Sequence, residues 1–316
     1  MAVETDGDNN PAAEAHLVMY RRHIAAISIA LLSLILFVGA AWSEGAGGAP
    51  KKRGAAKCDR AQFRVILDVG HSVEAHGAMS ARNVAEYDFN FRLAWEIQQG
   101  LIQDGFTKTV LLVTDGAAIP SLVKRVADAN QLSASLFLSI HHDSVPDSFL
   151  EDWEYEGVPS HFSDRFSGHS LFVSYENPYL KASLLFGKLL GNQLKQRGLQ
   201  YARQYTQEFM GRYQRELVDA DAGVYRYDKL VVLRATQMPA VLLEAGSIIN
   251  RDEEMLMNSP EHRAVISAAV TTAIEMFCDV RSPRSEIARP ATASTAAKSA
   301  ARPAAPAVPP SAVRDR

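Results

Sequence analysis

The chain has 316 residues, of which 47% are apolar and 22% are charged, and this composition excludes wholesale disorder and fibrous repeats. Its 33 basic and 36 acidic residues give a net charge of −3, which argues against a nucleic-acid partner held by a broad basic surface. Two cysteines are too few for a disulfide-rich scaffold or a cysteine-based zinc module.

The N-terminal part, residues 1–43, contains an uncharged apolar run at 24–42 that follows Arg21 and Arg22. Two interpretations stay open, because such a run fits either a transmembrane anchor or a signal peptide. A start at Met19 would give a compact signal peptide. In both interpretations the rest of the chain is exported, because the basic flank stays on the cytoplasmic side of the membrane. We therefore expect the protein to lie in the periplasm or cell envelope, tethered to the membrane through 24–42 if the run is retained.

Composition divides the rest of the chain into three parts. Residues 44–60 are a linker rich in Gly, Ala and Lys, 61–280 have the pattern of one folded domain, and 281–316 form an Ala/Pro-rich tail that we expect to be disordered. Cys58 and Cys278 bracket the predicted domain. In an oxidising compartment they could form one disulfide, and two buried free thiols are the alternative.

Apolar runs alternate with amphipathic helical patterns through the predicted domain. This alternation, with strands that are apolar throughout, indicates an α/β fold: a mainly parallel twisted sheet with helices on both faces, in a single catalytic domain. In chain order we expect a strand at 63–69, a helix at 88–103, a strand at 109–114, a helix from Pro120, strands at 136–140 and 171–175, a helix at 180–197, strands at 230–233 and 239–243, and a helix from Ser259 to about Phe277.

Polar side chains with metal-binding chemistry follow three predicted strands. His71, His141 and Glu244 each come at or just after the carboxyl end of an apolar strand, and Glu86 lies where the first helix begins. Carboxyl ends of parallel strands meet at one edge of an open sheet, where sites form. Imidazoles and carboxylates are the ligands of a hydrolytic zinc ion. Taken singly, each residue has an ordinary alternative, such as a loop histidine or an acidic residue favoured at a helix start.

Four motifs in this order, VILDVGHS, AEYDFN, FLSIHHD and MPAVLLEAGSIIN, resemble the zinc-dependent N-acetylmuramoyl-L-alanine amidases that cleave bacterial peptidoglycan. The resemblance covers about residues 63–277. It implies that His71, Glu86 and His141 are the ligands of Zn²⁺, that Glu244 is the catalytic base, and that Asp143 has a supporting role.

The resemblance also implies the reaction. A metal-bound water would attack the amide bond between N-acetylmuramic acid and the L-alanine of the stem peptide, with Glu244 as general base. Two other functions remain open: a zinc peptidase that cuts within the stem peptide, and a non-catalytic peptidoglycan-binding scaffold on the same fold.

Departures from the family pattern lie beside the motifs. Val69 stands where the family usually has Pro, Ser72 where it often has Gly, and Ser247-Ile248 where an aromatic residue is frequent. His142 replaces what is commonly a small residue; it either lines the substrate cleft or has no part in the site.

The stretches 146–168 and 200–228 show little periodicity. Some relatives place a self-inhibiting helix in this part of the chain, which a periplasmic activator displaces. One short helix at 206–217, with Glu208 or Glu216 capping the zinc, would be the equivalent here. A wall of the substrate groove or a plain surface loop is the alternative.

Overall fold

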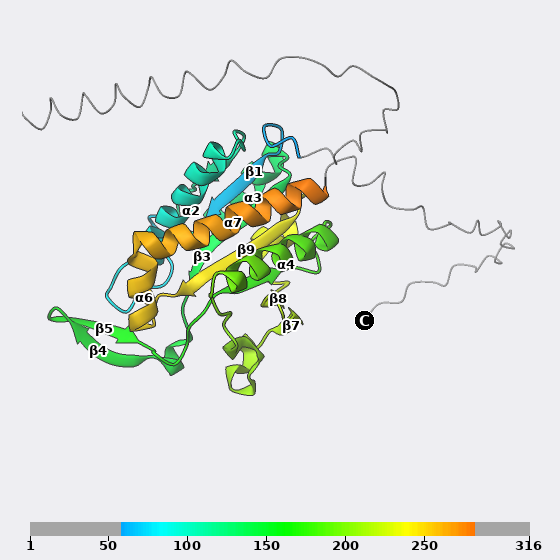
Figure 1. Ribbon diagram of the computed structural model, residues 1–316. Coiled ribbons are helices and arrows are strands. Elements are labelled where there is room, and N and C mark those ends of the chain that lie inside the picture. Colours follow the sequence, from blue (N-terminus) through cyan, green and yellow to red (C-terminus); the bar gives the residue numbers. More distant parts are fainter. Residues whose placement is uncertain (1–57, 282–316) are drawn as a thin grey trace, which may run out of the picture. The chain divides into compact units, whose positions relative to one another are not determined.

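The computed structural model describes residues 58–281 (Figure 1). Three predicted parts of the chain lie wholly or mostly outside these residues: the export segment, the linker except for 58–60, and the tail except for Arg281. No helix in the part of the chain that the structure describes is long and apolar enough to span a membrane.

A seven-stranded sheet in the order β2-β1-β3-β9-β6-β8-β7 forms the centre of the molecule. The β1–β2, β1–β3, β3–β9 and β6–β8 pairs are parallel, whereas β6–β9 and β7–β8 are antiparallel. The predicted mainly parallel sheet is confirmed. The strands are β1 (Val65–Val69), β2 (Val110–Leu112), β3 (Leu136–Asp143), β6 (Ser170–Val173), β7 (Glu216–Asp219), β8 (Val224–Arg226) and β9 (Ala240–Ser247).

Helices cover both faces of this sheet, as predicted. Figure 1 shows α2 (Glu86–Gln103), α4 (Leu180–Gln196) and α7 (Pro260–Val280) in front of the strands and α3 (Ala118–Leu132) behind them. Successive strand side chains point to opposite faces. Accordingly, Val241 and Leu243 of β9 belong to the apolar cluster under α2, α4 and α7, while Leu242 belongs to the cluster on the α3 side.

The segment predicted as a strand at 230–233 is instead a short helix, α5 (Val231–Ala235). Both Val232 and Leu233 are buried. A helical turn can direct two successive side chains toward one core, whereas a strand would point them to opposite sides. The side-chain amide of Asn177 donates to the carbonyl oxygens of Leu233, Thr236 and Met238, and so holds the end of the turn.

Several further elements were not predicted, β7 and β8 of the central sheet among them. The irregular stretch after β3 contains a 3-10 turn, η1 (Asp147–Phe149), and a two-stranded hairpin of β4 (Glu151–Tyr155) and β5 (Val158–Phe162), which projects beyond the carboxyl ends of β3 and β9 (Figure 1). A helix α6 (Arg251–Asn258) precedes α7, and the side chain of Asn250 caps it by accepting from the backbone N–H groups of Asp252 and Glu253.

Cys58 and Cys278 form a disulfide, with their Cα atoms 5.4 Å apart. The bond joins the residues just before β1 to the last turns of α7, and the backbone N–H of Cys58 also donates to Asp279 at 2.9 Å. Of the two alternatives that the sequence left open, the structure favours the pair.

Replacing both cysteines by serine should lower the free energy of unfolding by up to about 5 kcal/mol, because the bond closes a loop with a sequence separation of 220 residues. Urea unfolding followed by circular dichroism measures the change. Reducing agent should destabilise the wild-type chain and leave the double variant unaffected. Equal stability of the wild-type and variant chains under oxidising conditions would contradict the pairing.

Candidate active site

The parallel register of β3 and β9 brings two of the predicted site residues together. His141 and Glu244 are direct register partners on these neighbouring strands. On the other side of β3, Val69 at the end of β1 pairs with Ile140. Gly70 and His71, which follow Val69, therefore lie at the same edge of the sheet as His141. The site therefore forms at the carboxyl ends of three adjacent strands, as the sequence predicted.

Three of the predicted residues form a compact group of donor atoms. One nitrogen of each of His71 and His141 and one oxygen of Glu86 all lie within 4.8 Å of one another. His71 Nε2 is 2.9 Å from Glu86 Oε2, and His141 Nδ1 is 3.0 Å from Glu86 Oε1. Among the described residues this is the single group of its kind. Two imidazoles and one carboxylate can together hold a metal ion and leave a position free for another ligand.

Close packing around this group explains two glycines. A Cβ atom at Gly70 would overlap the ring of His141, and a Cβ at Gly77 would overlap Glu86 Oε2 and the ring of His71. Gly77 also has φ +80°, a left-handed conformation that favours glycine. His71 has φ 67° as well, and a non-glycine residue in this region is held there by its surroundings.

A buried ion pair beneath the site holds the backbone of His71. Arg125 on α3 lies 3.2 Å from Asp68 in β1 and donates to the carbonyl oxygen of His71 at 2.6 Å. Ser139 of β3 donates to the same aspartate at 2.6 Å. No sequence motif identifies these residues as part of the site, although a charged residue inside the apolar strand at 63–69 was an available signal.

Glu86 is held by groups from three segments. Asn90, one turn further along α2, donates to Glu86 Oε1 at 3.1 Å, and the backbone N–H groups of Ala78 and His142 donate at 3.2 and 3.3 Å. Burial raises the pKa of Glu86, but the hydrogen bonds with His141 and His71 outweigh it and hold this pKa below its usual value. The carboxylate is therefore ionised and oriented toward the two imidazoles.

His142 does not line a cleft. Its side chain is buried on the α2 side of the sheet, its Nδ1 is 2.8 Å from Asn90 Oδ1, and its ring is tilted against Phe89. Burial lowers the pKa of His142 to about 3, so the ring is neutral. Nδ1 then carries the proton and donates to Asn90, whose amide group can in turn donate to Glu86. His142 thus belongs to the support of the site.

Two further carboxyl groups, Glu244 and Asp143, lie near Glu86. Burial raises the pKa of Glu244 well above its usual value, and the charges of Asp143 and Glu86 raise it further. Burial also raises the pKa of Asp143 to about 7, although a hydrogen bond from Tyr205 opposes the shift. Glu244 Oε2 is buried and has no hydrogen-bond partner among the described residues. A bound cation would stabilise these three neighbouring acidic groups, one of which has an oxygen without a partner.

Tyr205 is a site residue that the sequence did not reveal. Its hydroxyl group lies 2.8 and 2.7 Å from the two carboxylate oxygens of Asp143, to which it donates. Burial raises the pKa of its phenol, and the charges of Asp143 and Glu244 raise it further. Tyr205 lies in η2 (Gln204–Thr206), within the stretch that shows no periodicity. The tertiary contact alone identifies it.

The single helix expected at 206–217 does not form. The segment contains a short 3-10 turn, η3 (Glu208–Tyr213), which is broken at Gly211, and β7 begins at Glu216. Neither Glu208 nor Glu216 belongs to the donor group, and Glu216 pairs instead with Arg226 at 3.3 Å. Gly211 adopts non-helical backbone angles of φ 53° and ψ −119°, which interrupt the helical hydrogen bonds.

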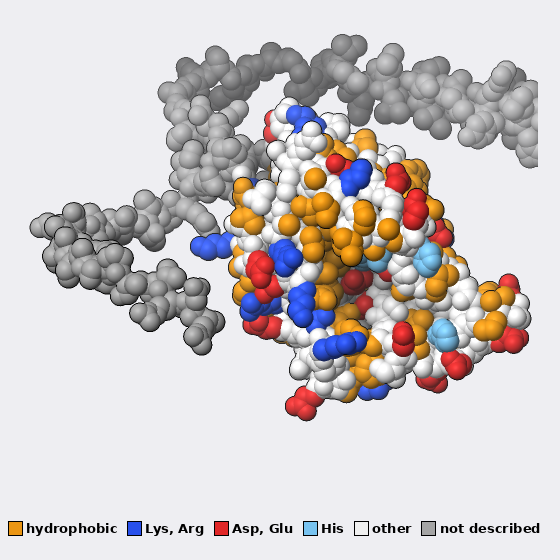
Figure 2. Space-filling model, turned by 180° about the vertical axis from the view of Figure 1, so that it is seen from behind, with side chains coloured by type: hydrophobic (Ala, Val, Ile, Leu, Met, Phe, Trp, Pro, Cys, Tyr) orange, Lys and Arg blue, Asp and Glu red, His pale blue; other side chains and the backbone are white. Residues whose placement is uncertain are grey.

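Glu244 faces the α3 side of the sheet, because it alternates with Leu243 and Ala245 of the α2–α4–α7 side. Figure 2 views the molecule from behind, which is the side on which Figure 1 places α3, and shows a hollow with acidic and histidine side chains in and around it.

Comparisons with known proteins agree with this arrangement. A family model described as N-acetylmuramoyl-L-alanine amidase matches residues 65–276. A putative N-acetylmuramoyl-L-alanine amidase of Buchnera aphidicola is 23% identical over 214 residues, which cover 67% of this chain and 95% of that protein. The amidase AmiC of Escherichia coli is 24% identical over 238 residues and 67% of this chain, but only 52% of AmiC is matched. The chain thus spans about half the length of AmiC.

A solved structure shows the same fold. The amidase Ami1 from Mycobacterium smegmatis superimposes with a TM-score of 0.54 at 21% sequence identity, over 71% of this chain and 100% of that one.

Proposed function

Because this chain belongs to the N-acetylmuramoyl-L-alanine amidase family, we propose that it hydrolyses the amide bond between N-acetylmuramic acid and the L-alanine of the peptidoglycan stem peptide. The observation that carries this proposal is the donor group of His71, Glu86 and His141 with Glu244 as the strand neighbour of His141. Peptidoglycan is then the substrate, and the folded domain at 61–280 is the catalytic unit.

His71, Glu86 and His141 would hold a zinc ion. The fit rests on the chemistry of the donors and on the buried, unpartnered oxygen of Glu244 beside them. When bound, zinc supplies Lewis acidity, which lowers the pKa of a water molecule and polarises a carbonyl group. Asn90 fixes the orientation of Glu86 as a ligand, and Arg125 holds the backbone of His71.

Glu244 would act as general base and then as general acid. Its carboxylate accepts a proton from the attacking water while a C–O bond forms at the scissile carbonyl carbon. The C–N bond then breaks, and Glu244 returns the proton to the departing nitrogen of L-alanine. Burial, together with repulsion from Asp143 and Glu86, raises the pKa of Glu244. A cation near Glu86 would oppose this shift, so that the carboxylate is ionised when it accepts the proton.

Export would bring the domain to this substrate. The apolar run at 24–42 supports location in the periplasm or cell envelope, either as a cleaved signal peptide or as a membrane tether. The disulfide between Cys58 and Cys278 also supports an oxidising compartment.

Digestion of purified sacculi by the full-length chain, followed by mass spectrometry, tests the reaction. We expect free stem peptides that begin with L-alanine, because the bond that breaks is the one to the lactyl group. Shortened stem peptides would indicate the zinc peptidase, and binding to sacculi without release would indicate the scaffold. Either of the last two results would refute the proposed activity.

Two variants separate metal binding from proton transfer. His71→Ala should lose both stoichiometric zinc and turnover, whereas Glu244→Gln should keep zinc and lose about 10²–10⁴-fold in turnover. Metal content by elemental analysis, measured beside the rate of sacculus digestion, checks both. A His71→Ala protein that retains one zinc per chain would disprove the ligand assignment.

Tyr205→Phe should lower kcat while leaving KM nearly unchanged, because the hydroxyl group holds Asp143 beside Glu244 and is not assigned to substrate binding. We expect a loss of about tenfold, in the range of one charge-assisted hydrogen bond. Tyr175→Phe, at a tyrosine that is 39% exposed, is the matched control and should have no effect. Equal kinetics for both variants would show that Tyr205 does not support the site.

A further inference from the structure

Three aromatic side chains form a ridge on the outer side of α2. Tyr87, Phe91 and Trp95 are four residues apart, so they share one face of the helix and follow one another at intervals of about 6 Å. Phe91 is 38% exposed and Trp95 is 52% exposed. The other side of α2 is apolar and already buried in the core. An amphipathic helix normally places polar residues toward solvent, so this exposed aromatic ridge indicates a binding surface.

A pocket opens beside the first two rings of the aromatic ridge. Its volume is about 370 Å³, which is within the range of small-molecule pockets. It is lined by Val84, Tyr87, Asp88, Phe91 and Arg92. The ring centroids of Tyr87 and Phe91 are 6.2 Å apart. The pocket therefore offers aromatic surface together with one acidic and one basic side chain.

The aromatic ridge begins next to the candidate active site. Tyr87 directly follows Glu86, whose carboxylate belongs to the donor group. The backbone N–H of Tyr87 donates to the carbonyl oxygen of His76 at 3.0 Å, and His76 lies in the loop that joins His71 to α2. A long ligand that reaches the donor group can therefore continue along α2 over the three rings.

The charges around the pocket favour an uncharged ligand. Burial raises the pKa of Tyr87, and three acidic neighbours raise it further: Asp115, Asp88 and Glu74. The phenol therefore keeps its proton near pH 7. The acidic groups repel an anion, whereas Arg92 in the pocket wall repels a cation. A ligand with hydroxyl groups and no charge meets neither repulsion, and the phenol, the carboxylate of Asp88 and the guanidinium can all hydrogen-bond to it.

We propose that the aromatic ridge binds the glycan strand of peptidoglycan, with the C–H faces of successive sugars packed against Tyr87, Phe91 and Trp95. The negatively polarised face of an aromatic ring attracts such C–H groups. The spacing of the rings along α2 is close to the length of one sugar in a β-1,4-linked strand. This inference rests on the proposed function, because that function makes peptidoglycan the substrate.

Saturation-transfer NMR with the full-length chain and β-1,4-linked oligosaccharides of N-acetylglucosamine tests this surface. These sugars carry no stem peptide, so their binding is measured whether or not the chain hydrolyses peptidoglycan. We expect saturable binding, with the hexasaccharide bound about tenfold or more tightly than the disaccharide, because a longer strand contacts all three rings.

Two substitutions of one residue separate aromatic stacking from general apolar contact. Trp95→Leu should weaken binding of the hexasaccharide about tenfold, whereas Trp95→Phe keeps an aromatic face and should stay within about threefold of the wild type. Phe91→Leu should behave as Trp95→Leu does. Both positions are exposed on a helix and leucine is a good helix former, so we expect the variants to fold, and thermal unfolding checks this.

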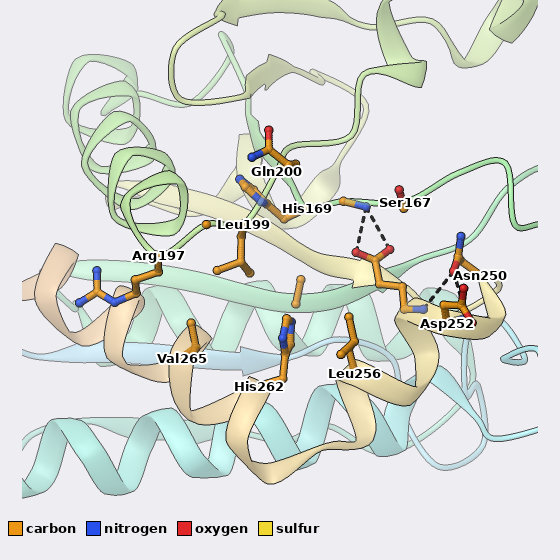
Figure 3. A pocket seen from close by; sticks show the side chains of 14 residues that line it. Ser167, His169, Arg197, Leu199, Gln200, Asn250, Asp252, Leu256, His262 and Val265 are labelled. Atoms are coloured by element: carbon orange, nitrogen blue, oxygen red, sulfur yellow. Dashed lines mark hydrogen bonds between the residues drawn. The ribbon is translucent and has the colours of Figure 1, made fainter.

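Two matched controls lie away from the aromatic ridge. Tyr179→Ala changes a tyrosine that is 43% exposed and lies just before α4. Leu256→Ala changes a leucine that is 49% exposed at a larger cavity, of about 540 Å³, between α6, α7 and the residues after α4 (Figure 3). None of the described residues that line this larger cavity is aromatic apart from two histidines. Both controls should bind the hexasaccharide as the wild type does.

The possible results distinguish the glycan surface from the proposed activity. Absence of saturable binding to the wild type, or equal binding by the wild type and Trp95→Leu, would overturn the glycan surface. Tighter binding of hexalysine than of the hexasaccharide would assign the aromatic ridge to a basic partner and would also overturn it. Release of stem peptides from sacculi without binding of the hexasaccharide would refute the glycan surface alone. Binding of the hexasaccharide without any release would refute the amidase activity alone.

Discussion

The parallel register between β3 and β9 is the constraint on which the site depends. It makes His141 and Glu244 direct neighbours and points both to the α3 side of the sheet. Because side chains alternate along a strand, a slip of one residue in β9 would place Ala245 beside His141 and turn Glu244 toward the α2–α4–α7 core. The buried aliphatic residues of β9 oppose such a slip, since it would also exchange the faces of Val241 and Leu243.

Several acidic side chains are buried close together around that register. Glu86 is ionised beside two imidazoles, while Glu244 and Asp143 have raised pKa values because they are buried near it and near each other. A buried cluster of this kind is costly without a cation, and a bound cation would stabilise it. The left-handed backbone of His71 adds strain, which the buried Arg125 offsets by donating to its carbonyl oxygen.

The same alternation of side chains gives the two faces of β9 different surroundings. Glu244 faces the α3 side of the sheet, whereas Ala245 lines a cavity on the opposite side. Glu253 lies at that cavity and accepts from the backbone N–H of Ser247, the last residue of β9. The end of β9 is therefore shared by the proposed catalytic site and this cavity.

The sequence by itself determined the α/β class, the parallel core and the donor residues His71, Glu86 and His141, because apolar strands ending in polar residues are a local pattern and the four motifs are specific. The tertiary structure alone decided the helix at Val231–Ala235, the hairpin after β3, the disulfide and the place of Tyr205. These features depend on contacts between residues far apart in the chain. Tyr205, for example, donates a hydrogen bond to Asp143, which is 62 positions away, and a periodic pattern along the chain cannot predict such a contact.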